Sequence, residues 1–328
     1  MTLAFGVLSS HEPPASVAQL VDALGRDARV WIHHDDSKGP RPALGRRDVR
    51  FVRAPVATGW GEWSLCEAIL ALMREALEEP GWEHFQLLSG SCLPIRPIDD
   101  FARHVAASPA DVHMDAIPLD RDDEALMSHG YRLYAPDGTL RHRVLRRLRR
   151  WYVGPRPDTV SRAGLSLAVP RADARAHPFA RVSVAAFRAA RRGTVPGFAH
   201  PFREGLGGWV GSTWWGARRA VCRHLVSASE DGPLAAYARS MPIPDECYFQ
   251  TLACSGDWRV GPSNHWITPF AGAHPGAATL ADLPPMLASR RWFARKFAPD
   301  AADPARRVIL ARLYSTPAHD RRRLARVA

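Results

Sequence analysis

At residues 84–91 the chain carries the sequence His-Phe-Gln-Leu-Leu-Ser-Gly-Ser. Residues 84–88 have the length and apolar character of a buried strand, and Ser89-Gly90-Ser91 would follow at its carboxyl end. Three similar stretches lie upstream: Ala4–Leu8, Arg29–His33 and Val49–Val52. Because helical patterns separate these strands, the alternation predicts an α/β fold with a mostly parallel sheet flanked by helices.

Two of the intervening helices are expected to begin with capping boxes. Ser16-Val-Ala-Gln19 would open the first helix and Ser64-Leu-Cys-Glu67 the second, since such pairs satisfy free backbone amides at a helix start. The second helix presents an apolar face between Leu65 and Leu77, and Pro80 would end it.

The chain has 328 residues, 46% of them hydrophobic, and a formal net charge of +11 that comes almost entirely from arginine. This length allows one large α/β domain or two smaller ones. The charge favours anionic partners such as nucleic acid, phospholipid headgroups or phosphorylated substrates. A GC-rich genome also produces an Arg-, Ala- and Pro-rich chain, so the charge does not choose among these partners.

Cysteine usage and the N-terminus bear on localisation. The five cysteines form no CxxC pair, which favours free thiols in a reducing compartment. The apolar start of the chain has no basic region before it, and no apolar stretch approaches the roughly 20 residues of a membrane span. We expect a cytoplasmic protein, and peripheral contact with the anionic inner face of the membrane stays open.

Residues 1–300 are expected to form one domain, with residues 111–200 as a loop-rich insertion. This insertion holds an acidic cluster at residues 120–124 and a basic run from Arg141 to Arg150. Residues 301–328 are rich in arginine and predict a basic tail or a surface helix.

The segment Pro244-Asp-Glu246 offers a candidate catalytic base. If Asp245 caps the following helix, Glu246 lies in its first turn, where the positive helix end favours an ionised carboxylate. Acidic residues in first turns commonly serve only to complement the helix dipole, so this pattern alone leaves both interpretations open.

Two further segments could bind ligands. Arg295 and Lys296 lie between aromatic residues in Trp292-Phe-Ala-Arg-Lys-Phe297, a pattern that can present two cations to a pyrophosphate or leave them solvated. The glycines and tryptophans of Gly207–Trp215 could stack against a sugar or pack in the core.

The sequence predicts no metal site. His33, His34 and Asp35 would alternate between the two faces of a strand, and no zinc spacing accompanies them. Asp120-Arg-Asp122 has the D-x-D form of metal sites in many sugar transferases, but no apolar strand precedes it. The chain also lacks Walker A, G-x-S-x-G and G-x-G-x-x-G motifs.

Six motifs follow one another along the chain: Ile32-His-His-Asp35, Gly59-Trp-Gly-Glu-Trp-Ser64, Phe85–Arg96, Gly211-Ser-Thr-Trp214, Pro244-Asp-Glu246 and Phe293-Ala-Arg-Lys-Phe297. Over roughly residues 1–300 this series resembles the family of core-2/I-branching N-acetylglucosaminyltransferases and peptide O-xylosyltransferases. The resemblance implies a GT-A fold and an inverting transfer of a sugar from a UDP-sugar, with no metal or other cofactor.

The resemblance also implies roles for individual residues. Asp35 matches the residue that reads the nucleoside, Glu246 the catalytic base, and Trp214 an aromatic residue of the sugar site. Arg295 and Lys296 match the pair that binds the donor diphosphate in place of a metal ion. The other expected donor-side residues are His33, Trp60, Ser89 and Gly90. The other expected acceptor-side or sugar-binding residues are Ser212, Asp245 and Trp266, and the insertion at residues 111–200 is expected on the acceptor side.

One motif departs from the family pattern. The usual Ser-Gly-x-Asp-x-Pro is Ser89-Gly-Ser-Cys92-Leu-Pro94 in this chain, so the contribution of that aspartate must come from elsewhere or be absent. The transferred sugar is expected to be N-acetylglucosamine or xylose, and the acceptor a polysaccharide, glycolipid or glycoprotein. Two other interpretations stay open: a basic nucleic-acid-binding protein, and a catalytically inactive sugar-binding subunit of the same fold.

Overall fold

The computed structural model describes residues 1–46, 48–122, 124–126, 128–129, 158–169, 201–202, 206–228, 232–271 and 274–315. The basic run from Arg141 to Arg150 and the last residues, 316–328, lie outside this part of the chain.

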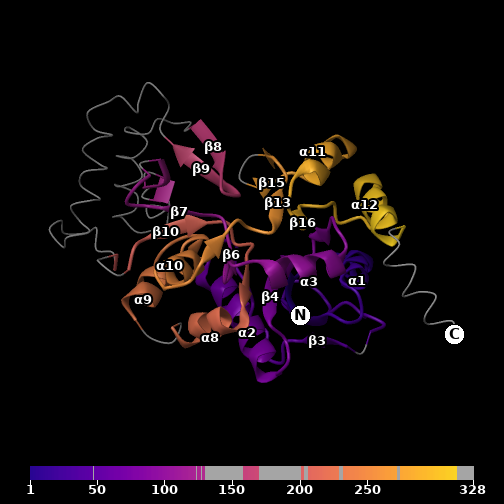
Figure 1. Ribbon diagram of the computed structural model, residues 1–328, viewed down its shortest axis with the longest axis horizontal. Coiled ribbons are helices and arrows are strands. Elements are labelled where there is room, and N and C mark those ends of the chain that lie inside the picture. Colours follow the sequence, from indigo (N-terminus) through magenta and orange to yellow (C-terminus); the bar gives the residue numbers. More distant parts are fainter. Residues whose placement is uncertain are drawn as a thin grey trace.

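A seven-stranded mixed sheet forms the centre of the described structure (Figure 1). Its strands, in spatial order, are β12 (Val260–Gly261), β6 (Val112–His113), β11 (Gly216–Arg218), β4 (His84–Ser89), β1 (Leu3–Ser9), β2 (Arg29–His34) and β3 (Val49–Phe51). All neighbours are parallel except β11, which runs antiparallel to both β4 and β6. The predicted mostly parallel sheet is confirmed, and the arrangement is consistent with a GT-A-like Rossmann fold.

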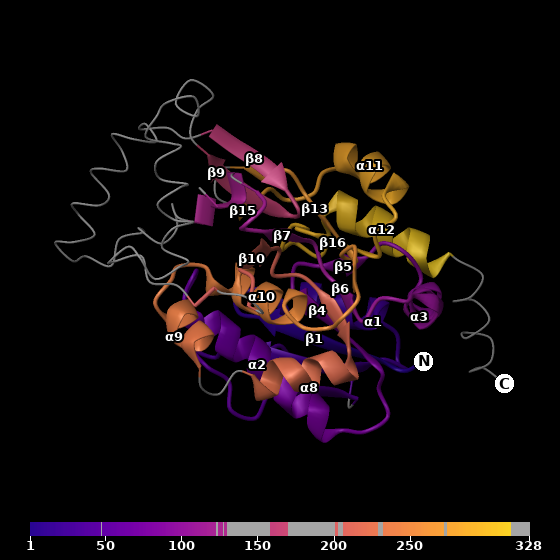
Figure 2. The ribbon, with the colours of Figure 1, turned by 60° about the vertical axis from the view of Figure 1, so that its left-hand side comes forward.

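Helices cover both faces of the sheet because its central strands are buried on both sides. On β1, Phe5 and Val7 join a core with α1 (Pro14–Ala23), α3 (Ile98–Ala107) and α12 (Pro304–Tyr314). Ala4 and Leu8 face a second core that contains α2 (Trp63–Glu78), α8 (Arg219–Ser227) and α10 (Tyr248–Cys254). Figure 2 shows α2 and α8 along this second face.

Shorter elements surround the carboxyl ends of the central strands. Three strands form a second sheet in the order β13 (His265–Ile267), β16 (Phe293–Arg295) and β5 (Leu93–Pro94). The paired strands are β7 (Ala116–Pro118) with β10 (Trp209–Gly211), β8 (Asp158–Arg162) with β9 (Leu165–Val169), and β14 (Phe270–Ala271) with β15 (His274–Pro275). The other helices of the described residues are α9 (Pro233–Arg239), α11 (Leu283–Ala288), and the 3₁₀ turns Pro244–Glu246 and Leu280–Asp282.

The two predicted capping boxes are wrong. Helix α1 begins at Pro14, whose fixed φ suits the first helical position, and the Ser16 hydroxyl donates back to the carbonyl of Pro13 at 2.9 Å. Helix α2 begins at Trp63, one residue before the expected cap. The Ser64 hydroxyl instead accepts a hydrogen bond from the Gly59 amide at 2.9 Å.

A buried arginine fixes the helix that follows residue 300. The Arg306 guanidinium donates to Gln19 Oε1 at 2.9 Å and to the Ser16 carbonyl at 2.9 Å, both on α1, and to the Ala298 carbonyl at 3.2 Å. Ile309 and Leu313 of α12 join the same core as α1. The Arg-rich C-terminal region therefore includes a helix that packs against the N-terminal part of the sheet.

Among the described helices, none has both the length and the apolar character needed to cross a bilayer.

Buried histidines make the stability of the fold depend on pH. The rings of His84 on β4 and His113 on β6 lie 5.7 Å apart, and His104 of α3 lies 5.6 Å from His113. Burial lowers the pKa of His84 to about 3 and that of His113 to about 4. Both imidazoles are therefore neutral at pH 7 and resist protonation in the folded state.

We expect the free energy of unfolding to fall as the pH drops from about 6.5 towards 4. Below the ordinary histidine pKa, His84 and His113 bind protons in the unfolded chain but stay neutral in the folded protein. This difference lowers the free energy of unfolding by about 1.4 kcal/mol per pH unit for each group. Urea unfolding at several pH values measures this slope. When both residues are replaced with glutamine, the free energy of unfolding should fall less between pH 8 and pH 4 than it does in the unmodified protein. An unchanged pH dependence would contradict the assignment of this effect to His84 and His113.

Candidate active site

Arg295 is held at the carboxyl end of β4 by two serine hydroxyls. Its Nη1 donates to Ser89 Oγ at 2.7 Å and to Ser91 Oγ at 2.8 Å. The guanidinium carbon lies 4.5 Å from the centre of the Trp214 ring, within the range of a cation–π contact. The antiparallel pairing of β16 with β5 and the bond from the Phe297 amide to the Ser91 carbonyl at 2.9 Å fix this position.

Arg295 forms no ion pair among the described residues, and the nearby Glu12 carboxylate acts on its charge only from a distance. Its hydrogen-bond acceptors are neutral hydroxyls, and they occupy Nη1 alone. Burial lowers the pKa of Arg295, but a guanidinium stays protonated in proteins. Lys296 follows directly, and within the described part of the chain its ammonium also lacks an ion-pair partner. Two adjacent cations without carboxylate partners make this position suited to an anion.

Thr268 anchors both ends of the peptide group between the two cations. The Lys296 amide donates to Thr268 Oγ1 at 3.1 Å, and the Thr268 amide donates to the Arg295 carbonyl at 2.6 Å. The Thr268 hydroxyl in turn donates to the Gly276 carbonyl at 2.6 Å. These bonds join the strand that carries the cations to the segment after β13.

Cys92 occupies the position of the aspartate in the family's usual motif. Its Sγ lies 3.3 Å from both the amide and the hydroxyl of Ser89, inside the core. Burial raises the pKa of the Cys92 thiol, so this side chain is neutral and does not compensate the charge of Arg295. Gly90 lies beside Glu12. A Cβ atom at position 90 would be only 3.0 Å from the Glu12 carboxyl carbon.

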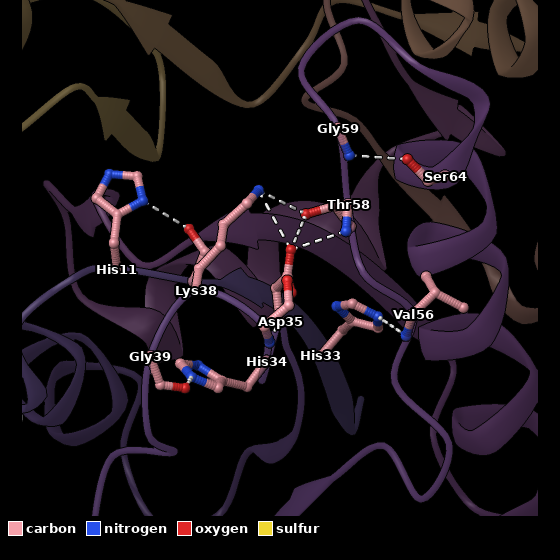
Figure 3. A network of polar contacts seen from close by, with 12 residues as sticks. His11, His33, His34, Asp35, Lys38, Gly39, Val56, Thr58, Gly59 and Ser64 are labelled. Carbon is pink, nitrogen blue, oxygen red and sulfur yellow. Dashed lines mark hydrogen bonds and ion pairs between the residues drawn. The ribbon is translucent and has the colours of Figure 1, made fainter.

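Asp35, at the end of β2, is buried and accepts hydrogen bonds from its own neighbours (Figure 3). Its Oδ1 accepts from the amide and hydroxyl of Ser37, at 3.1 and 2.5 Å. Its Oδ2 accepts from the amide and hydroxyl of Thr58, at 2.7 and 2.6 Å, and pairs with Lys38 at 3.2 Å. Burial alone would raise the pKa of Asp35, but these bonds hold it well below its usual range. Asp35 therefore fixes the backbone before Trp60, and its contact with a nucleoside stays a prediction.

The neighbouring histidines also hold the loops after β2. His33 Nε2 accepts from the Val56 amide at 3.0 Å, and burial lowers the pKa of His33, so this ring is neutral. His34 bonds the Ser9 hydroxyl at 3.2 Å and the Gly39 carbonyl at 3.0 Å. Within the described ranges, no group of three or more potential metal ligands occurs here or elsewhere.

Trp60 lies between two other segments of the site. Its side chain is 69% exposed, and its ring centre is 5.4 Å from that of His274 on β15. The next residue, Gly61, accepts a hydrogen bond at its carbonyl from the Ile243 amide at 2.7 Å. Trp60 therefore connects the β14–β15 hairpin with the segment that leads to Glu246.

Asp245 does not cap α10, so that prediction is wrong. Cys247 precedes the helix without a side-chain cap, and Asp245 Oδ2 instead accepts from the Thr213 hydroxyl at 2.6 Å. Gln250 of α10 donates to the Ser212 carbonyl at 2.9 Å, so the helix also holds the loop before Trp214. Glu246 ends the 3₁₀ turn and is half-buried.

A continuous series of contacts links most of the predicted site residues. Trp60 contacts His274, whose hairpin is joined through Thr268 to Arg295 and Lys296. Arg295 contacts Ser89 and Trp214, and the loop before Trp214 is joined through Asp245 to the Ile243 segment and back to Gly61. Sequence reasoning missed the hydroxyl residues that make these links, because an isolated serine or threonine carries no distinctive pattern. They are Thr58, Ser91, Thr213 and Thr268.

Trp266 lies on β13, the strand that pairs with β16, and lines a cavity of about 800 Å³. The walls are residues 265–270, Met114–Ala116, the β8–β9 turn at Ser161–Gly164, and Arg291. Asp122 of the D-x-D sequence pairs with Arg162 at 2.6 Å, and its Oδ1 accepts from the Ala125 amide at 2.9 Å. Asp122 therefore has a structural function beside this turn.

Residues 30–166 match the family model described as Core-2/I-Branching enzyme. Over this segment the chain is similar to the enzymes of the Core-2/I-branching family. Enzymes of this family are glycosyltransferases and are metal-independent, so the resemblance expected from the motifs is confirmed, together with the reaction class of sugar transfer. The matched segment includes Asp35, Trp60 and Ser89, whereas Glu246 and the Arg295–Lys296 pair follow it. No curated protein matches the chain.

Replacing Asp35 with asparagine should lower the free energy of unfolding by about 2 kcal/mol, because a buried, charge-assisted network loses its charge. Asp36→Asn is the matched control, since Asp36 is exposed and pairs with Arg41 at the surface. The control should cost less than about 1 kcal/mol. Urea unfolding compares the two variants, and equal effects would show that the Asp35 network does not hold the loop.

Proposed function

We propose that this glycosyltransferase moves a sugar from a UDP-sugar to a hydroxyl group of a glycan, with one inversion at the anomeric carbon and without a metal ion. The observation that supports this most strongly is the pair Arg295 and Lys296, two adjacent cations without carboxylate partners in the described structure, at the carboxyl end of β4. In open α/β sheets this edge is where ligands bind.

The donor diphosphate would occupy the position in front of these cations. Departure of UDP leaves negative charge on the diphosphate, so fixed cations there stabilise the transition state more than the ground state. Arg295 keeps Nε and Nη2 available for two phosphate oxygens, because only Nη1 is engaged by serine. Ser89 and Gly90 lie beside this position, and His33, Asp35 and Trp60 are proposed for the nucleoside side.

Glu246 is proposed as the base that removes the proton of the acceptor hydroxyl. Attack from the face opposite the leaving diphosphate gives one inversion, through a transition state that resembles an oxocarbenium ion as in glycoside hydrolysis. Asp245 fixes Thr213 and thereby links the Glu246 turn to the loop of Ser212 and Trp214. These residues, with Trp266, are proposed for the sugar and acceptor side.

N-acetylglucosamine is the first donor sugar to test, and xylose the second. Pro244-Asp-Glu246 favours the former, whereas Phe293-Ala-Arg-Lys-Phe297 favours the latter. The proposed acceptors are cell-surface polysaccharides, glycolipids or glycoproteins. The alternative, an inactive sugar-binding subunit of the same fold, predicts no turnover, whereas a glycosyltransferase turns over its donor.

Glu246→Gln should lower turnover by about a hundredfold or more while UDP affinity stays nearly unchanged, because the amide cannot accept the proton. Release of UDP from UDP-N-acetylglucosamine and UDP-xylose in the presence of acceptor measures turnover, and calorimetry measures UDP affinity. Glu67→Gln, at an exposed position of α2, is the matched control. Full turnover in Glu246→Gln would exclude Glu246 as the base.

Lys296→Ala should weaken UDP binding by about tenfold, the loss expected for one charge-assisted contact. Arg307→Ala, at an exposed position of α12, removes a cation elsewhere and should leave the affinity unchanged. Addition of EDTA should not reduce the activity of the unmodified enzyme. Strict dependence on manganese or magnesium would contradict the metal-free mechanism.

A further inference from the structure

We propose that the carboxylate of Glu12 weakens the binding of the product UDP more than that of the UDP-sugar, and thereby favours exchange of product for donor. The inference rests on the proposed function, since it concerns the nucleotide that Arg295 and Lys296 would hold. Glu12 lies outside the six motifs that follow one another along the chain, in the turn between β1 and α1.

The carboxyl end of β1 lies between the two sides of the proposed donor site. On one side, the Asp35 amide donates to the Ser9 carbonyl at 2.9 Å. On the other side, the Gly90 amide donates to the Leu8 carbonyl at 2.8 Å. A nucleotide that extends from Asp35 to the cations would therefore pass the end of β1, and Glu12 follows this end directly.

The carboxyl group of Glu12 lies over Gly90. A Cβ atom at position 90 would be 3.0 Å from the Glu12 carboxyl carbon and 3.3 Å from Oε1, so the glycine leaves the room that this side chain occupies. Ser89 and Ser91, on either side of Gly90, are the residues whose hydroxyls hold Arg295. The Glu12 carboxylate is thus next to the segment that positions the guanidinium.

The carboxylate of Glu12 is held in place but not neutralised. Its Oε2 accepts a hydrogen bond from the Ser10 amide at 2.8 Å, and the side chain is half-buried. Among the described residues, Oε1 accepts no hydrogen bond and Glu12 forms no ion pair. The adjacent His11 ring bonds the Ser10 hydroxyl at 2.9 Å instead. The negative charge of Glu12 therefore remains uncompensated beside the site.

The field of Glu12 reaches the proposed diphosphate position. Burial lowers the pKa of Arg295, and the Glu12 carboxylate opposes this shift. Burial raises the pKa of the Cys92 thiol, and Glu12 raises it further. A diphosphate in front of Arg295 would therefore be attracted by two cations and repelled by one carboxylate.

This repulsion acts unequally on substrate and product. The diphosphate of a UDP-sugar is esterified at both ends, whereas loss of the sugar leaves UDP with a terminal phosphate that gains a further negative charge above about pH 6. A fixed carboxylate nearby therefore destabilises bound UDP more than bound UDP-sugar. Cations alone would have the opposite effect, because they bind the more negative product more tightly.

Calorimetry with the full chain tests this role of Glu12. Glu12→Gln removes the charge but keeps the shape and an oxygen that can accept from the Ser10 amide. We expect UDP to bind this variant about tenfold more tightly, and UDP-N-acetylglucosamine or UDP-xylose about threefold more tightly. The affinity for uridine, which has no phosphate, should stay unchanged. Glu67→Gln, at an exposed position of α2, is the matched control and should change none of these affinities.

Two further measurements separate a charge effect from a rearranged turn. Glu12→Asp keeps the charge and should bind UDP more weakly than Glu12→Gln. The gain in UDP affinity of Glu12→Gln should also shrink when the ionic strength rises from about 0.02 M to about 0.5 M, because salt screens the repulsion. A gain that comes from a rearranged turn would not depend on salt in this way.

Three results would overturn the inference: an unchanged or lower UDP affinity in Glu12→Gln, equal gains for UDP and the UDP-sugar, or a gain that extends to uridine. Failure of the proposed function gives a different result. The unmodified chain would then bind no UDP, or UDP but neither UDP-sugar, and the inference would fall with it. Binding of UDP and a UDP-sugar that Glu12→Gln does not alter would overturn the role of Glu12 alone.

Discussion

The arrangement of the site depends on the guanidinium of Arg295, which is enclosed by two serine hydroxyls and the face of Trp214 without a carboxylate partner in the described structure. Enclosing a charge among neutral groups is costly unless an opposite charge arrives. Cys92 matters for the same reason: an aspartate at that position would supply a counter-ion in direct reach of Arg295, whereas the thiol is neutral.

The fold keeps this guanidinium in place through backbone pairing. The pairing of β16 with β5 sets Arg295 against the segment after β4, and Thr268 holds the peptide group between Arg295 and Lys296. On the opposite side of the site, Asp35 and His33 use buried hydrogen bonds to fix residues 56–58 ahead of Trp60. Preorganisation of this kind means that little rearrangement is needed when charge develops during the reaction.

Much of the fold could be predicted from sequence, because apolar strands that alternate with helical patterns leave few other arrangements. The start of α1 could not, since Pro14 provides a helix start that competes with the Ser16 capping box. Asp245 was likewise expected to cap α10, but Thr213, distant in the sequence, takes its carboxylate. A local sequence pattern indicates only hydrogen-bond partners that are close in the sequence. The order of the motifs along the chain indicated Arg295 and Lys296, whereas tertiary contacts alone reveal that Ser89, Ser91 and Trp214 surround them.

We propose that the enzyme recognises its donor through the diphosphate, with Arg295 as the principal contact. The most direct measurement is calorimetric binding of UDP and of uridine, both in EDTA, to the unmodified chain and to Arg295→Gln. UDP should bind the unmodified chain about a hundredfold more tightly than uridine, and the substitution should remove most of this difference. Equal affinities for UDP and uridine, or a difference that survives in Arg295→Gln, would contradict the account.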